Sequence, residues 1–305
     1  GSLNMDFVLR MPRLPAAGET VLGSHFEMVP GGKGANQSCA AGKLSNKPGA
    51  VRMVGKVGYD VFADHLKASL SAAGVDVSFV HATKSQPTGV ASIWVDESGQ
   101  NSIVVASGAN GALLPQEVGA YRPVFEGAAY VLFQLETPLV TVEAALRMAR
   151  EVGAKTILDP APAQPLSREI LALTDILTPN ETEACLLLGR PVSRLARDEV
   201  AEVASALRAA GTRAVVLKLG DQGCFYADGA TEHFVAGFRV TPVDSTAAGD
   251  VFNAALAVAL TENKAVPEAL QFANAAAALS VTRHGAQPSV PARSEVDAFL
   301  KSCAS

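Results

Sequence analysis

The chain has 305 residues, of which 49% are hydrophobic and 18% are charged, and its formal net charge is −5. It carries no long basic stripe of the kind that neutralises nucleic-acid phosphates, so we expect no nucleic-acid partner. The longest apolar runs, such as Val251–Leu260, are far shorter than a membrane span, so we expect no membrane association either.

The compartment is indicated by the first residues and by the cysteines. The chain opens without a basic region followed by an apolar stretch, so no secretion signal is expected. No C-x-x-C pair suggests zinc or redox chemistry among the four scattered cysteines Cys39, Cys185, Cys224 and Cys303. Unpaired thiols fit a reducing cytoplasm, and a bridge between two of them is the less favoured alternative.

The N-terminal third has the alternating pattern of paired strands. Asp6–Met11 and Thr20–Met28 are strand-like and are separated by prolines and a glycine. Gly89–Val95 and Asn101–Ala106 alternate around the turn Asp96–Gly99. These segments predict antiparallel hairpins, which form either a small projecting sheet or ordinary edge strands of a larger body.

From Ala128 onward, apolar strands alternate with amphipathic helices. Strands are predicted at Ala128–Leu135, Lys155–Leu158, Asp175–Leu177 and Arg213–Leu219. Helices are predicted at Leu139–Val152, Glu181–Leu188 and Ala196–Ala210, and the alanine-rich Ala273–Leu279 is also interpreted as helical. This alternation predicts an α/β fold with a mostly parallel sheet covered on both faces.

The run Asp244-Ser-Thr-Ala-Ala-Gly-Asp250 lies where a loop turns into a helix. The small residues Ala247, Ala248 and Gly249 let backbone N–H groups approach a ligand, and a helix N-terminus favours an anion. Asp250 would then lie in the first helical turn, facing that anion. A stabilising first-turn aspartate is the structural alternative, and the two carboxylates six residues apart favour function.

A second glycine-rich loop, Pro30-Gly-Gly-Lys-Gly-Ala-Asn-Gln37, opens a predicted helix at Ala35–Leu44. Its glycines allow close approach to a ligand, and Lys33 and Asn36 supply polar contacts. It is not a Walker A loop, and Gln37 breaks the dinucleotide pattern G-x-G-x-x-G. A plain turn is the alternative.

Two further segments are ambiguous by themselves. Asn180 and Glu183 have the spacing of a helix capping box, which is favoured over a Mg²⁺ site reached through water. The loop Lys218–Gly223 is equally consistent with a nucleotide loop and with a hairpin turn into Cys224–Ala227.

Taken in order, these segments resemble the phosphofructokinase-B-type carbohydrate kinases over essentially the whole chain. The glycine-lysine-glycine loop and Asp244–Asp250 carry the resemblance most specifically, together with the segments 1–6, 134–136, 180–183, 220–223 and 283–289. The resemblance implies one domain over residues 1–305, with a Rossmann-like three-layer α/β/α body and a small antiparallel β-sheet lid. The lid would be formed by about residues 6–30 and 88–107.

The family resemblance also implies an activity and a site. The ATP γ-phosphoryl would pass to O5 of D-ribose, giving D-ribose 5-phosphate and ADP, with Asp250 as general base and an anion hole at Ala247, Ala248 and Gly249. The sugar positions would be Asn4, Asp6, Gly32, Lys33, Gly34, Asn36, Glu136 and Asp250. The nucleotide positions would be Asn180, Lys218, Leu219, Gly220, Asp221, Gln222, Gly223, Gly249 and Asn274. Mg²⁺ would be held through water by Glu183, and an activating K⁺ by Asp244, Thr246, Ser280, Arg283, Gly285 and Ser289.

Several expectations qualify this assignment. Asp250 is taken to be near its reference pKa of about 3.9 and hence ionised at pH 7. Ala248 stands where many relatives have glycine, which is tolerated if its φ is negative. Relatives carry a strand before the first motif, and we expect its residues to precede Gly1 in the intact protein. An open sheet edge invites pairing, so a homodimer through the lid is expected.

Two alternatives to ribose phosphorylation stay open. One is a related kinase for fructose, 2-keto-3-deoxygluconate, deoxyribose or adenosine. The other is a catalytically silent sugar-binding regulator on the same fold. The amide of Asn4 favours ribose over deoxyribose, because it can pair with a 2-hydroxyl group.

Overall fold

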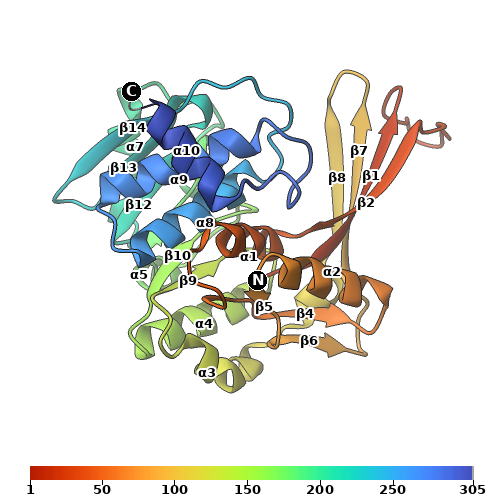
Figure 1. The fold of residues 1–305 in the computed structure, drawn as a ribbon, viewed down its shortest axis with the longest axis horizontal. Helices are drawn as coiled ribbons and strands as arrows, with labels where there is room; N and C mark the ends of the chain where they lie inside the picture. Colours follow the sequence, from red (N-terminus) through yellow and green to blue (C-terminus); the bar gives the residue numbers. More distant parts are fainter. Residues whose placement is uncertain (304–305) are drawn as a thin grey trace.

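The computed structural model describes residues 1–303, and its body is built on a six-stranded sheet. The strands are β9 (Tyr130–Phe133), β10 (Lys155–Leu158), β11 (Ile176–Leu177), β12 (Ala214–Lys218), β13 (Gly223–Ala227) and β14 (Glu232–Ala236). Their order is β14-β13-β12-β11-β10-β9 (Figure 1). The strands β9 to β12 pair in parallel, and β13 and β14 continue the sheet antiparallel.

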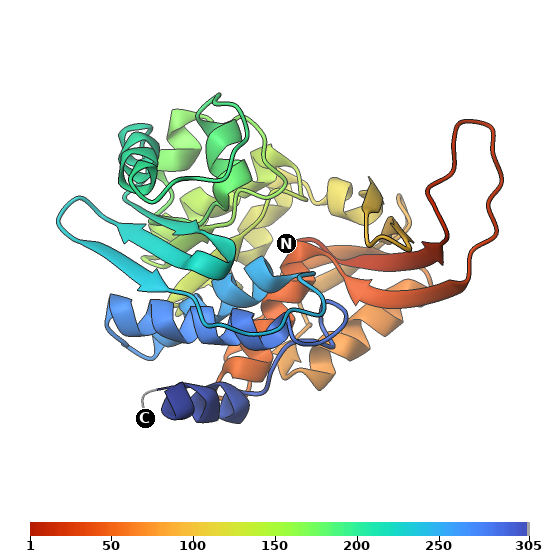
Figure 2. The same ribbon diagram turned by 90° about the horizontal axis from the view of Figure 1, so that it is seen from above.

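Helices cover both faces of this sheet. One layer contains α4 (Leu139–Glu151), α5 (Arg168–Ala172), α6 (Glu181–Leu187) and α7 (Glu199–Ala209). The other contains α1 (Lys33–Leu44), α8 (Ala248–Thr261), α9 (Val266–Ser280) and α10 (Arg293–Cys303). Figure 2 shows the green and blue helices on opposite sides of the strands. Along β12, Val215 and Leu217 join one core cluster and Ala214 and Val216 the other, so the predicted three-layer body is confirmed.

Short strands and helices complete the body. The two-residue strands β3 (Val51–Arg52) and β5 (Val75–Asp76) pair in parallel, as do β4 (Gly55–Gly58) and β6 (Val80–Thr83). The remaining helices are α2 (Val61–Ala72), α3 (Arg122–Phe125) and the 3₁₀ segments Gly108–Ala112, Pro115–Tyr121 and Gly220–Gln222. Within residues 1–303, none of the helices has the length and apolar character needed to cross a bilayer.

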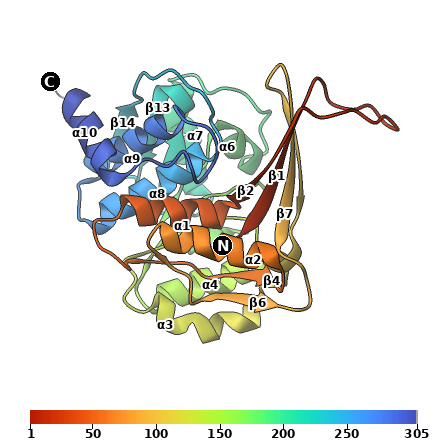
Figure 3. The same cartoon turned by 45° about the vertical axis from the view of Figure 1, so that its right-hand side comes forward.

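A second sheet of four strands projects from the body (Figure 3). Its order is β2 (His25–Gly31), β1 (Asn4–Met11), β7 (Gly89–Asp96) and β8 (Asn101–Ala106). The pairs β1–β2 and β7–β8 are antiparallel as predicted, but the two pairs are joined through a parallel β1–β7 contact. The projecting sheet is therefore mixed rather than wholly antiparallel, because its two halves come from separate parts of the chain.

Several predicted boundaries shift for local reasons. The strand predicted from Thr20 begins at His25, because the pairing with β1 runs out at Arg10. The helix predicted from Ala196 begins at Glu199, whose carboxylate accepts the N–H of Ala196 at 2.8 Å. All four cysteines are free thiols, as expected.

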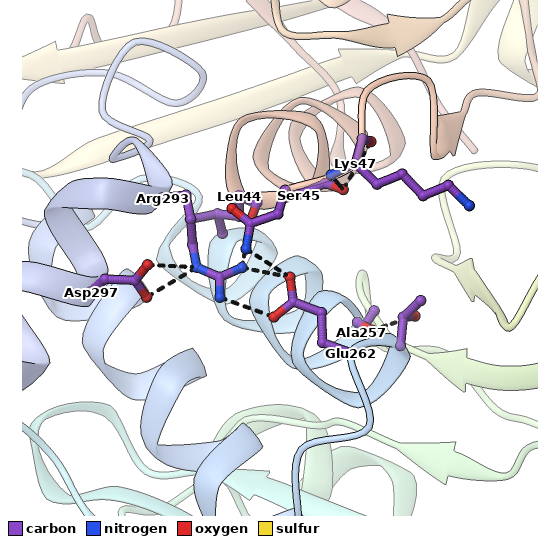
Figure 4. Close-up of polar contacts among 9 residues, drawn as sticks. Leu44, Ser45, Lys47, Ala257, Glu262, Arg293 and Asp297 are labelled. Carbon is purple, nitrogen blue, oxygen red and sulfur yellow. Dashed lines mark hydrogen bonds and ion pairs between the residues drawn. The ribbon is translucent and has the colours of Figure 1, made fainter.

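Arg293 fastens the C-terminal helix α10 to the body (Figure 4). Its guanidinium donates to Glu262 at 2.6 and 3.0 Å, to Asp297 at 3.0 and 3.1 Å and to the Leu44 carbonyl at 3.2 Å. It also lies 4.8 Å from the centre of the Phe272 ring. Only 14% of the Arg293 side chain is exposed, so these contacts are largely shielded from water.

Arg293→Met is expected to lower the free energy of unfolding by about 2–4 kcal/mol, because it leaves the half-buried Glu262 carboxylate without its cation. Urea unfolding followed by circular dichroism measures the change. Arg122→Met is the matched control: the ion pair of Arg122 with Glu151 is exposed on both sides and should contribute less than about 1 kcal/mol. Equal losses in the two variants would contradict the anchoring role.

Candidate active site

Four of the predicted motifs, the loop at Lys33, Asn180–Glu183, Lys218–Gly223 and Asp244–Asp250, contribute residues to one cleft at the carboxyl ends of β10 and β12. Its volume is about 420 Å³. The N-termini of α1, α6 and α8 all contribute to its lining, which suits a polyanionic ligand. The lining residues are Lys33, Asp159, Ala161, Asn180, Glu181, Thr182, Glu183, Lys218, Gly220, Ser245, Ala247, Ala248, Gly249 and Asp250.

The turn before α8 presents backbone donors to this cleft. Ala247 has a left-handed φ of 59°, and α8 starts at Ala248, which therefore has the negative φ expected to tolerate its methyl group. The N–H of Ala248 donates to the Ser245 carbonyl at 3.2 Å. Among residues 1–303, the N–H groups of Ala247 and Gly249 have no acceptor, so these two are the free donors of the predicted anion hole. A left-handed alanine is strained, and it marks the point at which the backbone is bent towards the cleft.

Asp250 lies buried in the first turn of α8. Its carboxylate accepts hydrogen bonds from Asn36 Nδ2 at 3.2 Å and from Gln37 Nε2 at 3.0 Å. Burial raises the pKa of Asp250 to about 6, against the opposing effect of the Lys33 ammonium and with a further contribution from Asp159. The expectation of a pKa near 3.9 is therefore wrong, because the carboxylate is desolvated. At about 6 the group is still mainly ionised at pH 7, as a general base requires.

Asp159 and Gln37 are functional candidates that the sequence analysis missed. Asp159 Oδ1 accepts from Lys218 Nζ at 2.9 Å, and Oδ2 accepts from Gln37 Nε2 at 2.9 Å. Gln134 Nε2 donates to Gln37 Oε1 at 2.6 Å and so fixes the orientation of that amide. The available signal was an aspartate directly after a buried strand, at the edge where sites of parallel sheets form.

The predicted sugar residues gather beside Asp250, between the projecting sheet and the body. Burial, followed by the charges of Glu136 and Asp250, raises the pKa of Asp6 to about 7. Asp6 Oδ1 is buried and has no hydrogen-bond partner among residues 1–303. Asn4 Oδ1 accepts from Asn110 Nδ2 at 2.7 Å, which leaves the Asn4 amide N–H groups for a ligand. A buried acceptor without a partner and a neighbouring free donor are what a sugar hydroxyl would satisfy.

The glycine-lysine-glycine loop supports the same site. α1 begins at Lys33 rather than at Ala35, after Gly32 with a φ of 89°. Glu136 Oε2 accepts from the Lys33 N–H at 3.0 Å and from Ser2 Oγ at 2.6 Å, and Ser2 Oγ in turn accepts the Gly34 N–H at 3.1 Å. Burial alone would lower the pKa of the Lys33 ammonium, but the carboxylates around it, Asp250 first among them, raise it overall.

The capping box at the start of α6 is present. Asn180 Oδ1 accepts the Glu183 N–H at 2.8 Å, and Glu183 Oε2 accepts the Asn180 N–H at 2.7 Å. Among residues 1–303, Glu183 Oε1 has no partner, and burial raises the pKa of this carboxyl group. The cap and a magnesium role are therefore compatible, because each uses a different carboxylate oxygen.

The predicted nucleotide residues are only partly brought to the cleft. Asn180, Lys218, Gly220 and Gly249 line it. Leu219, Gln222 and Gly223 belong to the β12–β13 hairpin turn, which confirms the turn interpretation of this loop. Two other side chains are engaged elsewhere: Asp221 pairs with Arg194 at 2.6 Å, and Asn274 donates to the carbonyls of Val235 and Ala236 at 3.1 and 3.3 Å.

The predicted potassium residues come together beside the anion hole, on the loop before α8, at the last residue of α9 and on the loop that follows α9. Asp244 Oδ1 accepts the Thr246 N–H and Oδ2 accepts the Gly285 N–H, both at 2.9 Å. Ser280 and Ser289 are buried, and their hydroxyl groups donate to the Ala277 and Ala286 carbonyls, both at 2.8 Å. The side chain of Arg283 points to Glu295 instead, so only its backbone is available to a cation.

A helix N-terminus with free N–H groups and a buried aspartate beside it are the arrangement expected of a phosphotransferase. The pfkB family carbohydrate kinase model matches residues 1–293 of the chain. The chain belongs to the pfkB family of carbohydrate kinases, and it is a ribokinase-like sugar kinase.

Individual relatives agree with this assignment. The ribokinase of Haemophilus influenzae is 41% identical over 307 residues, covering 99% of this chain and 97% of the relative. The deoxyribokinase of Salmonella typhi is 33% identical, and the match covers 98% of this chain and 97% of the relative. The structure of Arabidopsis thaliana ribokinase complexed with ribose and ATP matches with a TM-score of 0.90 and a sequence identity of 33%. The match covers 99% of this chain and 97% of that chain.

Proposed function

We propose that this kinase transfers the γ-phosphoryl group of ATP to O5 of D-ribose, giving D-ribose 5-phosphate and ADP. The observation that carries the proposal is the buried Oδ1 of Asp6, which has no partner in the described part of the chain and lies next to the Asn4 amide, beside the buried Asp250 carboxylate. Vicinal sugar hydroxyls pair well with a carboxylate acceptor and an amide donor. The similarity to ribokinases over the whole chain supports the same substrate.

In the proposed mechanism, Asp250 accepts the proton of O5 as that oxygen attacks the γ-phosphorus. The N–H groups of Ala247 and Gly249 donate hydrogen bonds to the phosphoryl oxygens and so stabilise their negative charge. The partial positive charge at the N-terminus of α8 adds to this stabilisation. Asn36 and Gln37 hold the Asp250 carboxylate, so that it is already oriented before the sugar binds. Most of the catalysis in phosphoryl transfer comes from such positioning and charge stabilisation.

Mg²⁺ and K⁺ complete the proposed site. Glu183 lines the cleft, and its Oε1, which has no partner among residues 1–303, suits a hard cation reached through water. Mg²⁺ bound there would neutralise phosphate charge. The loop before α8, the end of α9 and the loop after it offer a carboxylate, hydroxyls and carbonyls from Asp244, Thr246, Ser280, Arg283, Gly285 and Ser289. That oxygen donor set suits K⁺, which would stabilise the anion-hole turn without touching the substrate.

A sugar panel tests the substrate assignment. ADP release is measured with ribose, 2-deoxyribose, fructose, 2-keto-3-deoxygluconate and adenosine in the presence of Mg²⁺ and K⁺. We expect the highest kcat/KM with ribose, because the Asn4 amide is left unpaired when the 2-hydroxyl is missing. A higher value for any other acceptor would overturn the ribose assignment, and ribose binding without turnover would point to a silent regulator.

Replacing K⁺ by Na⁺ at constant ionic strength is expected to lower kcat several-fold. The reason is that the smaller ion fits the same carbonyl and carboxylate oxygens poorly and leaves the Asp244 loop less firmly held. Thermal unfolding gives an independent measurement: K⁺ should stabilise the wild type more than Na⁺, and Asp244→Asn should remove the difference. Identical behaviour of the two salts would argue against the cation site.

We also propose a cytoplasmic homodimer that forms through the projecting sheet. Three neighbouring residues of the edge strand β8, Ile103, Val104 and Val105, are 55%, 67% and 47% exposed, and Phe26 of β2 is 55% exposed. Such an apolar open edge is typical of an interaction surface. Ile103→Glu is expected to convert the dimer to a monomer in light scattering, and a wild-type monomer would contradict the proposal.

A further inference from the structure

The side chain of Lys218 occupies an unusual place between a carboxylate and the anion hole. It extends from the end of β12, and its Nζ lies 2.9 Å from Oδ1 of Asp159. A Cβ atom added to Gly249 would lie only 3.4 Å from the same Nζ, so the ammonium group adjoins the turn that opens α8. The side chain of Lys218 is 12% exposed and that of Asp159 is 3% exposed. A shielded ammonium within reach of an anion site is well placed to take up a phosphate oxygen.

Asp159 connects this ammonium to the base through a single amide. Gln37 Nε2 donates to Asp159 Oδ2 at 2.9 Å and to Asp250 Oδ1 at 3.0 Å, so one nitrogen joins the two carboxylates. The hydrogen bond from Gln134 Nε2 to Gln37 Oε1 fixes which end of the Gln37 amide faces the two carboxylates. The chain Lys218–Asp159–Gln37–Asp250 therefore runs continuously from the nucleotide side of the cleft to the sugar side.

We propose that Lys218 binds the transferring phosphoryl group of ATP by moving its ammonium from Asp159 to that group, and that Asp159 is the positioning residue that holds it ready. The proposal rests on the proposed kinase function. A lysine ammonium on four methylene groups is a mobile point charge, which suits such a transfer better than a planar guanidinium. The move leaves the Asp159 charge without its cation, and this negative charge then favours proton acceptance at Asp250.

The electrostatic surroundings of Asp250 agree with this direction. The charged groups that face it are Lys33 from α1, Asp159 after β10 and Asp6 from β1. Glu136 acts on Lys33 and Asp6, while Glu183 interacts with Lys33, Lys218 and Asp159. Asp159 already contributes to the raised pKa of Asp250, after burial. Withdrawing the Lys218 ammonium would strengthen that contribution while the phosphoryl group is bound.

Three variants test the transfer: Lys218→Met, Asp159→Asn and the double variant. Lys218→Met is expected to lower kcat by about 10²-fold, because a donor aimed at developing charge is lost. The double variant replaces a buried ion pair by neutral groups of similar size, so it should fold even if Lys218→Met does not. We expect it to stay about 10²-fold slow. Recovery of the double variant to near wild-type kcat would overturn the proposal, since Lys218 would then only neutralise Asp159.

Two further readouts separate the proposed roles from a structural one. Titration calorimetry with a non-hydrolysable ATP analogue and with ADP should show a larger loss of affinity for the analogue in Lys218→Met. An equal loss for both nucleotides would contradict binding of the transferring group. Asp159→Asn should move the acid limb of the kcat/KM profile to lower pH, and an unmoved limb would contradict the connection to Asp250.

The substrate assignment does not affect this test. All comparisons use the sugar that the wild type phosphorylates best. A preference for fructose over ribose would overturn the proposed function and would leave the Lys218 comparison intact.

Discussion

Asp250→Asn is expected to lower kcat by about 10²–10⁴-fold with little change in sugar affinity, because it removes the proton acceptor and keeps the shape of the side chain. Measurements at saturating ribose and ATP give kcat, and calorimetry gives the ribose affinity. The substitution should not unfold the protein. The amide gives up one of the two hydrogen bonds that the carboxylate accepts from Asn36 and Gln37, but it also removes the cost of ionising a buried group with a raised pKa, and the two effects oppose each other.

The pH dependence of the wild type provides an independent check of the same base. The ionised form of Asp250 is the active one, so activity should be lost as the pH falls through the pKa of about 6. An acid limb near pH 6 in kcat/KM is therefore expected, and it should be missing from the residual activity of Asp250→Asn. A near-normal kcat in this variant, or a wild-type limb near pH 4, would contradict the assignment.

The motifs that could be predicted are those whose chemistry is local. Asp244–Asp250 and the loop at Lys33 each combine small residues with a helix start, and both lie where the cleft forms. The alternation of β7 and β8 likewise predicted their hairpin, because a short turn joins them. Such signals are contained within about ten residues, and the main chain cannot easily adopt another arrangement around them.

What could not be predicted depends on contacts between distant parts of the chain. Gln37 and Asp159 are 122 positions apart, and Gln37 and Asp250 are 213 apart, so no local pattern indicates their shared hydrogen bonds. The parallel pairing of β1 with β7 is of the same kind, because alternation indicates a buried face and not a partner strand. The raised pKa of Asp250 follows from burial, which only the packed structure determines.

Asp6→Asn is expected to reduce ribose affinity by about 10²-fold or more, since charged acceptors contribute about 1.5–3 kcal/mol per hydrogen bond. The same change should stabilise the unliganded protein above about pH 4, with the full effect reached above pH 7. The folded-state pKa of Asp6 is raised from 3.8 to about 7, so ionising it costs free energy that the unfolded chain does not spend. This penalty is absent below about pH 4, grows as the pH rises from 4 to 7, where the unfolded chain is ionised and the folded protein is not, and stays constant above pH 7 at about 4 kcal/mol or less.

The two effects together distinguish a functional carboxylate from a structural one. Replacing a carboxylate that stabilises the fold makes the protein less stable. Replacing a ligand-binding carboxylate that is buried at a cost in free energy makes the protein more stable and lowers its affinity for the ligand. Urea unfolding at pH 5 and pH 8 measures the difference between Asp6→Asn and the wild type, and calorimetry measures ribose binding. Asp64→Asn, on the exposed side of α2, is the matched control: it should leave ribose binding unchanged and alter stability by less than about 1 kcal/mol, to the same extent at both pH values. If Asp6→Asn destabilised the protein equally at both pH values, the carboxylate would have a structural role and would not be a binding group for a sugar hydroxyl.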